Sequence, residues 1–343
     1  MSVKILYAIQ GTGNGHLSRS LDIIPCLEKH GDVDILVSGN QGDLILPFKI
    51  KYKLSGLSFI FGKSGGVSLW KTIARTNIRK LLKSIKNLPV EDYDLVITDF
   101  EPVSAWACYF KNKACISLSH QAAVLRPGLP KPEHADMLGK LILNNYAPSS
   151  SYYGFHFSAF KDNIFTPVIR KQVREQTITD QGHYTVYLPS YDDKRLVSRL
   201  SEFKDVQWDV FSKHNSRPSK TNNITIQPVD SANFTSSMAA SSGVLCGAGF
   251  ETPAEALFLG KKLMVIPMKN QYEQHLNAAA LQEMKVPVIS SLKPKYNSLI
   301  ADWLKNGQRI PVNYPDITQE IITMIVKKHS ADTTFDNNDA LFK

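Results

Sequence analysis

The chain contains 343 residues, 43% of them hydrophobic, and has a formal net charge of +9. The length predicts two domains, and the apolar content is sufficient for packed cores, which excludes a disordered chain. The charge predicts an anionic partner: a phosphorylated substrate, a membrane surface or nucleic acid. No apolar run approaches about 18 residues and the start lacks a leader pattern, so we expect a cytoplasmic protein that can still attach to a membrane surface. The four scattered cysteines predict neither a zinc site nor a disulfide framework.

The first predicted element is a short apolar strand, Lys4–Ile9, followed by a glycine-rich turn at 11–16 and an amphipathic helix over 17–29. A strand, a glycine turn and a helix form the first unit of a doubly wound α/β domain. The turn is not a dinucleotide fingerprint, because His16 stands where the last glycine is required. The next strand, Val33–Val37, ends without an acid for a ribose, so we do not expect NAD binding.

His16 follows the strand edge at the start of the helix. The positive end of a helix dipole disfavours imidazolium, so we expect this ring to stay neutral and basic. One interpretation is a general base or a substrate contact. The other is a polar residue that only orders the loop.

A strand candidate, Leu57–Phe61, precedes a glycine-rich loop and a basic amphipathic helix, Ser68–Asn87. An apolar stripe beside lysines and arginines is typical of helices that meet anionic headgroups. The alternative is an ordinary domain helix that buries the stripe and leaves its charges in solvent. The residues predicted for membrane contact are Lys71, Arg75, Arg79, Lys80 and Lys83.

Two further strands are predicted to end in polar residues: Asp99 and Glu101 after one, and His120 after the other. Because ligands bind at the carboxyl ends of parallel strands, we expect these side chains at one rim together with His16. Asp99 or Glu101 could orient His16 as the base, with His120 as the second choice of base. Alternatively, Asp99 caps the following helix. The two strands are expected over Asp94–Thr98 and Ala114–Leu118.

The first domain is expected to close with the strand Tyr152–Phe157, and Asn163–Val168 to link it to the second. We therefore predict domains over residues 1–163 and 164–312, a final helix within 313–329 and a flexible tail at 330–343. Further elements of the second domain are expected over Tyr184–Leu188, Gln207–Phe211, Ile224–Gln227, Ser231–Ala240, Val244–Cys246, Leu263–Ile266, Gln271–Glu283 and Ile317–Lys327.

The stretch from Cys246 to Gln282 contains two strand–turn–helix units in succession. Gly247 and Gly249 allow a tight turn, and Thr252 and Pro253 suit a helix N-cap and first turn. Two helix N-termini then lie on one rim, where free N–H groups bind anions.

Polar side chains at these two helix starts match the parts of a nucleotide diphosphate sugar. Thr252 could add a hydroxyl to a phosphate, and Glu255 could accept hydrogen bonds from a ribose diol. Glu273 and Gln274 could contact sugar hydroxyls. The alternative is an ordinary βαβ repeat with surface acids.

The pattern Gly249-Phe250-Glu251-Thr252-Pro253-Ala254-Glu255, with Glu273-Gln274 ahead of Asn277-Ala278, resembles the donor segment of GT-B glycosyltransferases. The likeness is to the MurG-like group, related to families 28 and 1. It implies two Rossmann-like doubly wound domains facing across a cleft, with the first binding the acceptor and the last helix crossing back to it. The residues implied to bind the donor are Gly13, Gly15, Ser190, Val229, Gly247, Gly249, Phe250, Thr252, Glu255, Glu273, Gln274 and Asn277.

We therefore expect a hexosyltransferase that moves a sugar, from UDP as the resemblance favours, to a hydroxyl acceptor that is either lipid-linked or soluble. Inverting transfer needs one base, and we expect no cofactor or metal, because Asp32-Val33-Asp34 lies at a buried strand start away from the rim. One alternative is a nucleotide-sugar 2-epimerase, against which the lack of an acid cluster near Glu273 argues. The other is a non-catalytic nucleotide or nucleic-acid binder, which leaves Glu255 and Glu273 unexplained.

Overall fold

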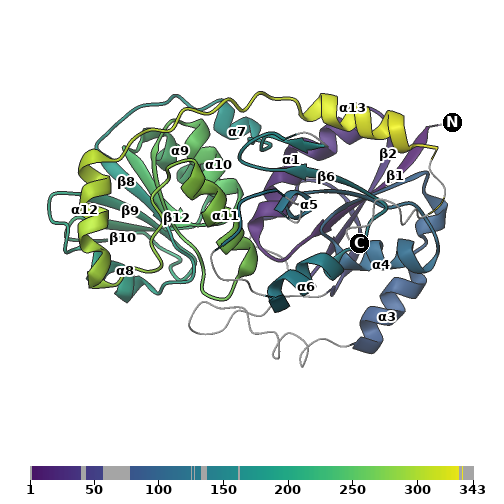
Figure 1. Cartoon of the computed structure of the whole chain (residues 1–343), viewed down its shortest axis with the longest axis horizontal. Coiled ribbons are helices and arrows are strands. Elements are labelled where there is room, and N and C mark those ends of the chain that lie inside the picture. Colours follow the sequence, from purple (N-terminus) through teal and green to yellow (C-terminus); the bar gives the residue numbers. More distant parts are fainter. Residues whose placement is uncertain are drawn as a thin grey trace.

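The computed structural model describes residues 2–39, 44–56, 78–124, 126, 128–132, 137–160, 163–331 and 334. These residues form two lobes side by side, each built around its own sheet (Figure 1). Helices flank both sheets, which confirms the predicted pair of doubly wound α/β domains.

The first sheet has seven parallel strands in the order β3-β2-β1-β4-β5-β6-β7. Its central strands are continuous apolar runs because helices cover both faces. The strands are β1 (Val3–Gln10), β2 (Gly31–Ser38), β3 (Ile50–Leu54), β4 (Leu95–Asp99), β5 (Ile116–Ser119), β6 (Ser151–Phe155) and β7 (Ile164–Phe165). The helices are α1 (Asn14–Glu28), α3 (Ile78–Asn87), α4 (Pro102–Phe110), α5 (His120–Val124) and α6 (Met137–Tyr146), with a short 3-10 turn at Val90–Asp92.

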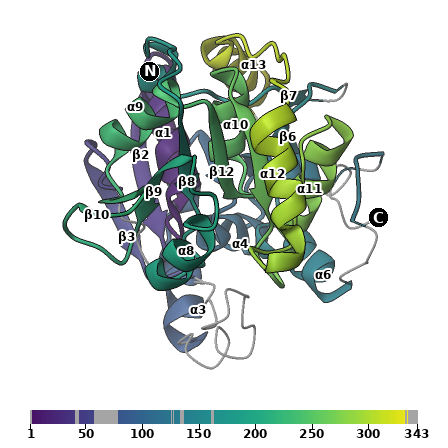
Figure 2. The ribbon, with the colours of Figure 1, turned by 90° about the vertical axis from the view of Figure 1, so that its left-hand side faces the viewer.

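The second sheet has the order β10-β11-β9-β8-β12-β13, parallel except for β10 at one edge (Figure 2). Its strands are β8 (His183–Tyr187), β9 (Gln207–Ser212), β10 (Ser219–Thr221), β11 (Ile224–Pro228), β12 (Gly243–Gly247) and β13 (Lys262–Ile266). Its helices are α7 (Lys171–Arg174), α8 (Asp193–Leu200), α9 (Ser231–Ala240), α10 (Glu251–Phe258), α11 (Tyr272–Glu283) and α12 (Asn297–Asn306), with a 3-10 turn at Pro294–Tyr296.

The first sheet extends further along the chain than the sequence predicts. The two-residue strand β7 pairs with β6, so Ile164 and Phe165 lie within the predicted linker and just past the predicted boundary at 163. A strand this short has no readable alternation, which is why Tyr152–Phe157 was predicted to be the last strand. The expected strand Leu57–Phe61, the part of helix Ser68–Asn87 before residue 78 and nearly all of the tail lie outside the described residues.

The chain returns to the first domain after α12. Helix α13 (Thr318–His329) packs against α1 and runs along the upper edge of the first domain in the view of Figure 1. The hydroxyl of Tyr153 lies 2.7 Å from Nε2 of His329, and His30 lies 3.0 Å from the hydroxyl of Thr323. Two separate segments, one before α7 and one before α13, therefore connect the lobes.

The domains share a continuous apolar core. One cluster of buried side chains contains Ile5 of the first sheet and Val244 of the second, and the rings of Phe157 and Phe250 are 5.0 Å apart across the boundary. The loop at the end of β1 thereby faces the loop at the end of β12. Among the described residues, no helix is both long and apolar enough to cross a membrane.

Candidate active site

Neighbouring strands bring His16 and Asp99 together. β1 pairs with β4 in a register that sets Ile9 opposite Asp99, and Gly13, at a φ of 91°, turns the chain into α1. The helix begins at Asn14, three residues earlier than predicted, so His16 lies in its first turn. Its Nδ1 lies 2.8 Å from Oδ1 of Asp99, as the sequence predicts for a base with an orienting acid.

Asp99 and Glu251 together outweigh the effect of burial on the pKa of His16. Burial by itself lowers the pKa of this ring, but the charge of Asp99 and its hydrogen bond raise the pKa above the ordinary value, with Arg19 opposing. The expectation that the helix dipole keeps the ring neutral misses this carboxylate. Nδ1–H donates to Asp99, which leaves Nε2 to accept a proton, and the side chain is 13% exposed.

Phe100 forms one wall beside this pair. It follows Asp99 with a φ of 55°, a left-handed conformation that costs energy in a residue with a side chain. Its ring stacks 6.4 Å from His16 and 4.7 Å from Tyr146 on α6. Gln10 donates to the Tyr146 hydroxyl at 2.8 Å. Aromatic and amide groups therefore surround the base on the first-domain side.

Glu101 does not orient His16, contrary to one of the two predictions for the acids. It is the N-cap of α4 and accepts hydrogen bonds from the backbone N–H groups of Val103 and Ser104. It also accepts from the Ser38 hydroxyl. The capping role considered for Asp99 belongs to Glu101, because the left-handed turn at Phe100 delays the helix start.

His120 joins the two domains and is not placed as a base. Its ring stacks on Phe250 of the second domain at 3.8 Å and an angle of 9°. Nδ1 lies 2.7 Å from the Phe155 carbonyl oxygen and Nε2 lies 2.6 Å from Oδ1 of Asn277. Burial lowers the pKa of His120 to about 3, against the two hydrogen bonds. A neutral ring can donate only one of these two hydrogen bonds, whereas a protonated ring donates both.

The donor half of the candidate site is built on the turn before α10. The helix begins at Glu251, and its N-cap is Phe250, which makes no side-chain capping bond. Thr252 is therefore in the first turn and is not the N-cap predicted from the sequence. A Cβ added at Gly249 would meet open space, so the backbone there is accessible to a ligand.

Glu255 is paired within the protein. Its two carboxylate oxygens accept hydrogen bonds from Nε and Nη2 of Arg170 at 2.5 and 2.7 Å, and its side chain is 3% exposed. Arg170 also donates to the hydroxyl of Ser231 at 3.0 Å. The predicted contact of Glu255 with a ribose stays a prediction, and it would have to share the carboxylate with this arginine.

Glu273 and Gln274, at the start of α11, have different surroundings: Glu273 is near His16, and Gln274 bonds the loop before the helix. Burial raises the pKa of Glu273, against the charge of His16 and a hydrogen bond from Gln121. Oε1 of Gln274 accepts from the backbone N–H of Met268 at 2.8 Å. Asn277 donates to the Ala248 carbonyl at 3.1 Å and is 1% exposed, so it braces the glycine turn.

The remaining predicted residues are more loosely tied to this cleft. Ser190 follows β8 and Val229 packs at the edge of the core, and their donor contacts stay predictions. Gly247 lies against Gln274, 3.7 Å from its Oε1 to the position of an added Cβ. Of the predicted membrane residues, Arg79, Lys80 and Lys83 are exposed on α3, while Lys71 and Arg75 lie outside the described residues.

Sequence reasoning missed three charged residues of the cleft: Arg19, Glu251 and Arg170. Arg19 donates to both oxygens of Asp99 at 2.7 and 2.9 Å, and its Nη1 lies 2.5 Å from Oε1 of Glu251. Gly15 accommodates this contact, because an added Cβ would lie 2.5 Å from Oε2 of Glu251. The available signal for Arg19 was its place one turn after His16 on a helix.

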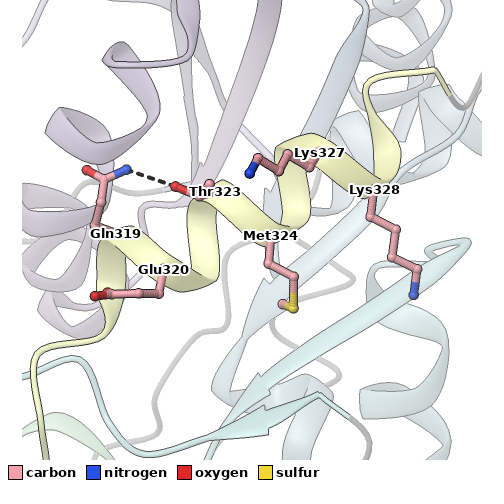
Figure 3. Close-up of a pocket in the computed structure, with 6 residues that line it drawn as sticks. All are labelled: Gln319, Glu320, Thr323, Met324, Lys327 and Lys328. Atoms are coloured by element: carbon pink, nitrogen blue, oxygen red, sulfur yellow. Dashed lines mark hydrogen bonds between the residues drawn. The ribbon is translucent and has the colours of Figure 1, made fainter.

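A hollow on the surface of the first domain is not part of this site. The hollow in Figure 3 follows the outer side of one helix, α13, and contains none of the predicted site residues. Within the described ranges, no group of three or more His, Cys, Asp or Glu side chains could hold a metal ion. Asp32 is exposed and Asp34 pairs with Lys51 at 2.6 Å, so this strand start is more open than predicted.

Comparisons with known proteins identify the family and the fold. The model of the family described as Glycosyl transferase family 1 matches residues 3–306. MurG of Acinetobacter baumannii is 14% identical with a TM-score of 0.55, covering 95% of this chain and 99% of its own. UGT89C1 of Arabidopsis thaliana complexed with UDP-L-rhamnose is 14% identical with a TM-score of 0.56, covering 96% and 94%. The spinosyn forosaminyltransferase SpnP is 10% identical with a TM-score of 0.55, covering 97% of both chains. A comparison with curated proteins finds no match.

Proposed function

Because the chain belongs to glycosyl transferase family 1 and has the GT-B fold, we propose that it transfers a hexose-type sugar from UDP to an acceptor hydroxyl, with inversion. The observation that carries this proposal is the His16–Asp99 pair, which faces the first turn of α10 across the cleft. A UDP complex of a structural neighbour, UGT89C1, supports the choice of nucleotide.

In this mechanism His16 is the general base. Nε2 takes the proton from the acceptor hydroxyl as its oxygen attacks the anomeric carbon, while Asp99 stabilises the imidazolium that forms. The bond between the anomeric carbon and the diphosphate breaks, and UDP leaves with the electron pair. The N–H groups at the starts of α10 and α11 would stabilise the charge on the leaving diphosphate.

The test is a panel of nucleotide sugars incubated with lipid-linked and soluble hydroxyl acceptors. We expect release of UDP that depends on the acceptor, a product of inverted anomeric configuration by NMR, and no loss of rate in EDTA. A retained configuration overturns the single-base mechanism, and loss of activity in EDTA overturns metal independence. Binding without turnover would instead point to a non-catalytic nucleotide binder.

A nucleotide-sugar 2-epimerase is the second candidate because the acids of the cleft are closer together than the sequence suggests. Glu251 and Glu273 interact electrostatically with each other and both act on His16. The lack of an acid cluster near Glu273 is therefore no longer an argument against epimerisation. Conversion of the sugar without any acceptor would favour this activity.

The acceptor proposed here is lipid-linked, with the first domain docked on an anionic membrane. Helix α3 exposes Ile78 and Leu82 (55% and 54%) next to Arg79 and Lys83, and α4 beside it exposes Phe110 (63%). Apolar side chains flanked by basic ones are typical of interfacial helices. In both views α3 lies at the outer edge of the molecule (Figures 1 and 2).

The docking is tested by sedimentation with anionic and neutral vesicles at low salt. We expect binding to anionic vesicles only, and the double change Arg79→Glu with Lys83→Glu should weaken binding by about thirtyfold or more, at about 1 kcal/mol per residue. Lys204→Glu with Lys305→Glu, exposed on the second domain, makes the same change in net charge and should act less. Equal effects of the two pairs would indicate attraction by net charge alone, and a soluble acceptor.

A further inference from the structure

Arg19 is a buried arginine that bonds acids from both domains. Its side chain is 1% exposed, Nη2 donates to Asp99 of the first domain, and Nη1 donates to Glu251 of the second. A guanidinium has no acceptor atom and keeps its proton at any ordinary pH. Arg19 is therefore a fixed positive charge between two carboxylates that different domains supply.

Charged side chains from four elements act on His16. They are Arg19 from α1, Asp99 from the end of β4, Glu251 from α10 and Glu273 from α11. The acids favour the imidazolium and Arg19 opposes it, as like and opposite charges require. Two of the acids belong to the second domain, so the basicity of His16 depends on where that domain lies.

We propose that Arg19 is a positioning residue that holds Asp99 for His16 and, through Glu251, connects the base to the donor-domain helix α10. In this structure Glu251 lies on Arg19 and partly neutralises it. Moving α10 away from α1 would remove that carboxylate and leave the positive charge of Arg19 acting in full on the ring. The pKa of His16 is therefore highest when Glu251 of α10 contacts Arg19. The use of this coupling in sugar transfer rests on the function proposed above, but the coupling itself does not.

The experiment is an NMR titration of the histidine ring protons in the full-length protein without substrate. His16→Gln identifies the signal of His16. Arg19→Gln removes the cation, so the midpoint of His16 should move to higher pH by on the order of one pH unit. Glu251→Gln removes an acid, so the midpoint should move to lower pH, by less, because Glu251 is 23% exposed.

Two further variants separate charge from packing. Arg19→Lys keeps the positive charge without the two-pronged contact, and should return the midpoint most of the way to that of the wild type. Arg170→Gln breaks the other buried pair, that with Glu255, and should leave the His16 midpoint unchanged.

Opposite shifts in Arg19→Gln and Glu251→Gln support the proposal, and a folded Glu251→Gln protein with an unmoved or raised midpoint overturns it. If Arg19→Gln does not fold, Glu251→Gln alone tests the proposal, because glutamine has the shape of the glutamate that it replaces. If the shifts occur but no nucleotide sugar is turned over, only the proposed function fails. If the enzyme is active and kcat/KM falls in Arg19→Gln and Glu251→Gln while the His16 midpoint stays fixed in both, only the coupling fails.

Discussion

His16 and His120 both follow strands of the first sheet and both face the second domain, yet their surroundings are opposite. His16 lies among charges, and Asp99 raises its pKa. His120 lies between an aromatic ring, an amide and a carbonyl group, and burial lowers its pKa to about 3. Position at a strand end therefore does not make a histidine a base. The charge beside the ring and an available nitrogen decide it.

Removing the base should have the largest effect. We expect His16→Ala to lower turnover by roughly 10²–10⁴, the usual range for general base catalysis, with little change in donor affinity. Steady-state kinetics and calorimetry with UDP measure the two quantities. If His16→Ala turns over normally while His120→Ala does not, the roles given to the two histidines are reversed.

Removing the ring that stacks on His120 should affect stability. Phe250 is 3% exposed and packs on both His120 and Phe157, so Phe250→Ala should cost about 3–5 kcal/mol in the free energy of unfolding. Urea unfolding measures this, with Phe110→Ala, which removes a ring that is 63% exposed, as the control. A loss below about 1 kcal/mol would mean that the stack does not support the domain boundary.

The two rings should also have opposite effects on stability as the pH changes. The folded pKa of His120, about 3, lies below the ordinary value, so the unfolded chain takes up the proton first. Stability is then lost as the pH falls below about 6.5, by about 2 kcal/mol between pH 7 and pH 5. His16, whose pKa is raised, adds stability below its ordinary pKa and loses it as the pH rises through the folded value.

Urea unfolding of the wild type and His120→Gln at pH 7 and pH 5 isolates the His120 contribution. The variant should lack this part of the loss on acidification. Equal losses in the two proteins would mean that the folded His120 ring carries its proton, with the Phe155 carbonyl and the Asn277 amide oxygen both accepting hydrogen bonds.

The smallest expected effect concerns the donor side of the same boundary. Glu255→Gln keeps the shape of the side chain but replaces charged hydrogen bonds with neutral ones, so UDP affinity should fall by about 1 kcal/mol, or roughly fivefold. Calorimetry measures the affinity, and thermal unfolding shows whether the loss of the Arg170 ion pair has disturbed the fold. Unchanged affinity in a stable variant removes Glu255 from the ribose contact.

The sequence predicts the βα units well because each depends on local periodicity, and α9 begins and ends at the predicted residues, Ser231 and Ala240. It also predicts the His16–Asp99 pair, since parallel strands bring their carboxyl ends to one rim. It cannot place Arg19, because the acid of the second domain that Arg19 contacts is 232 residues away along the chain. Asp99 bonds His16 and Glu101 caps α4 because the backbone at Phe100 is left-handed. A phenylalanine in the sequence does not indicate that conformation.

The return of α13 to the first domain joins the two lobes a second time. A body joined to another by a single segment can swivel in any direction, whereas two joining segments leave mainly a rotation about the line between them. Here one segment precedes α7 and the other precedes α13, beyond residue 306, where the family match ends. The backbone N–H of Lys171 also bonds Asp22 on α1 at 3.0 Å, which stiffens the first of these joints. The chain outside the family match therefore provides a second connection between the domain of His16 and the domain of α10.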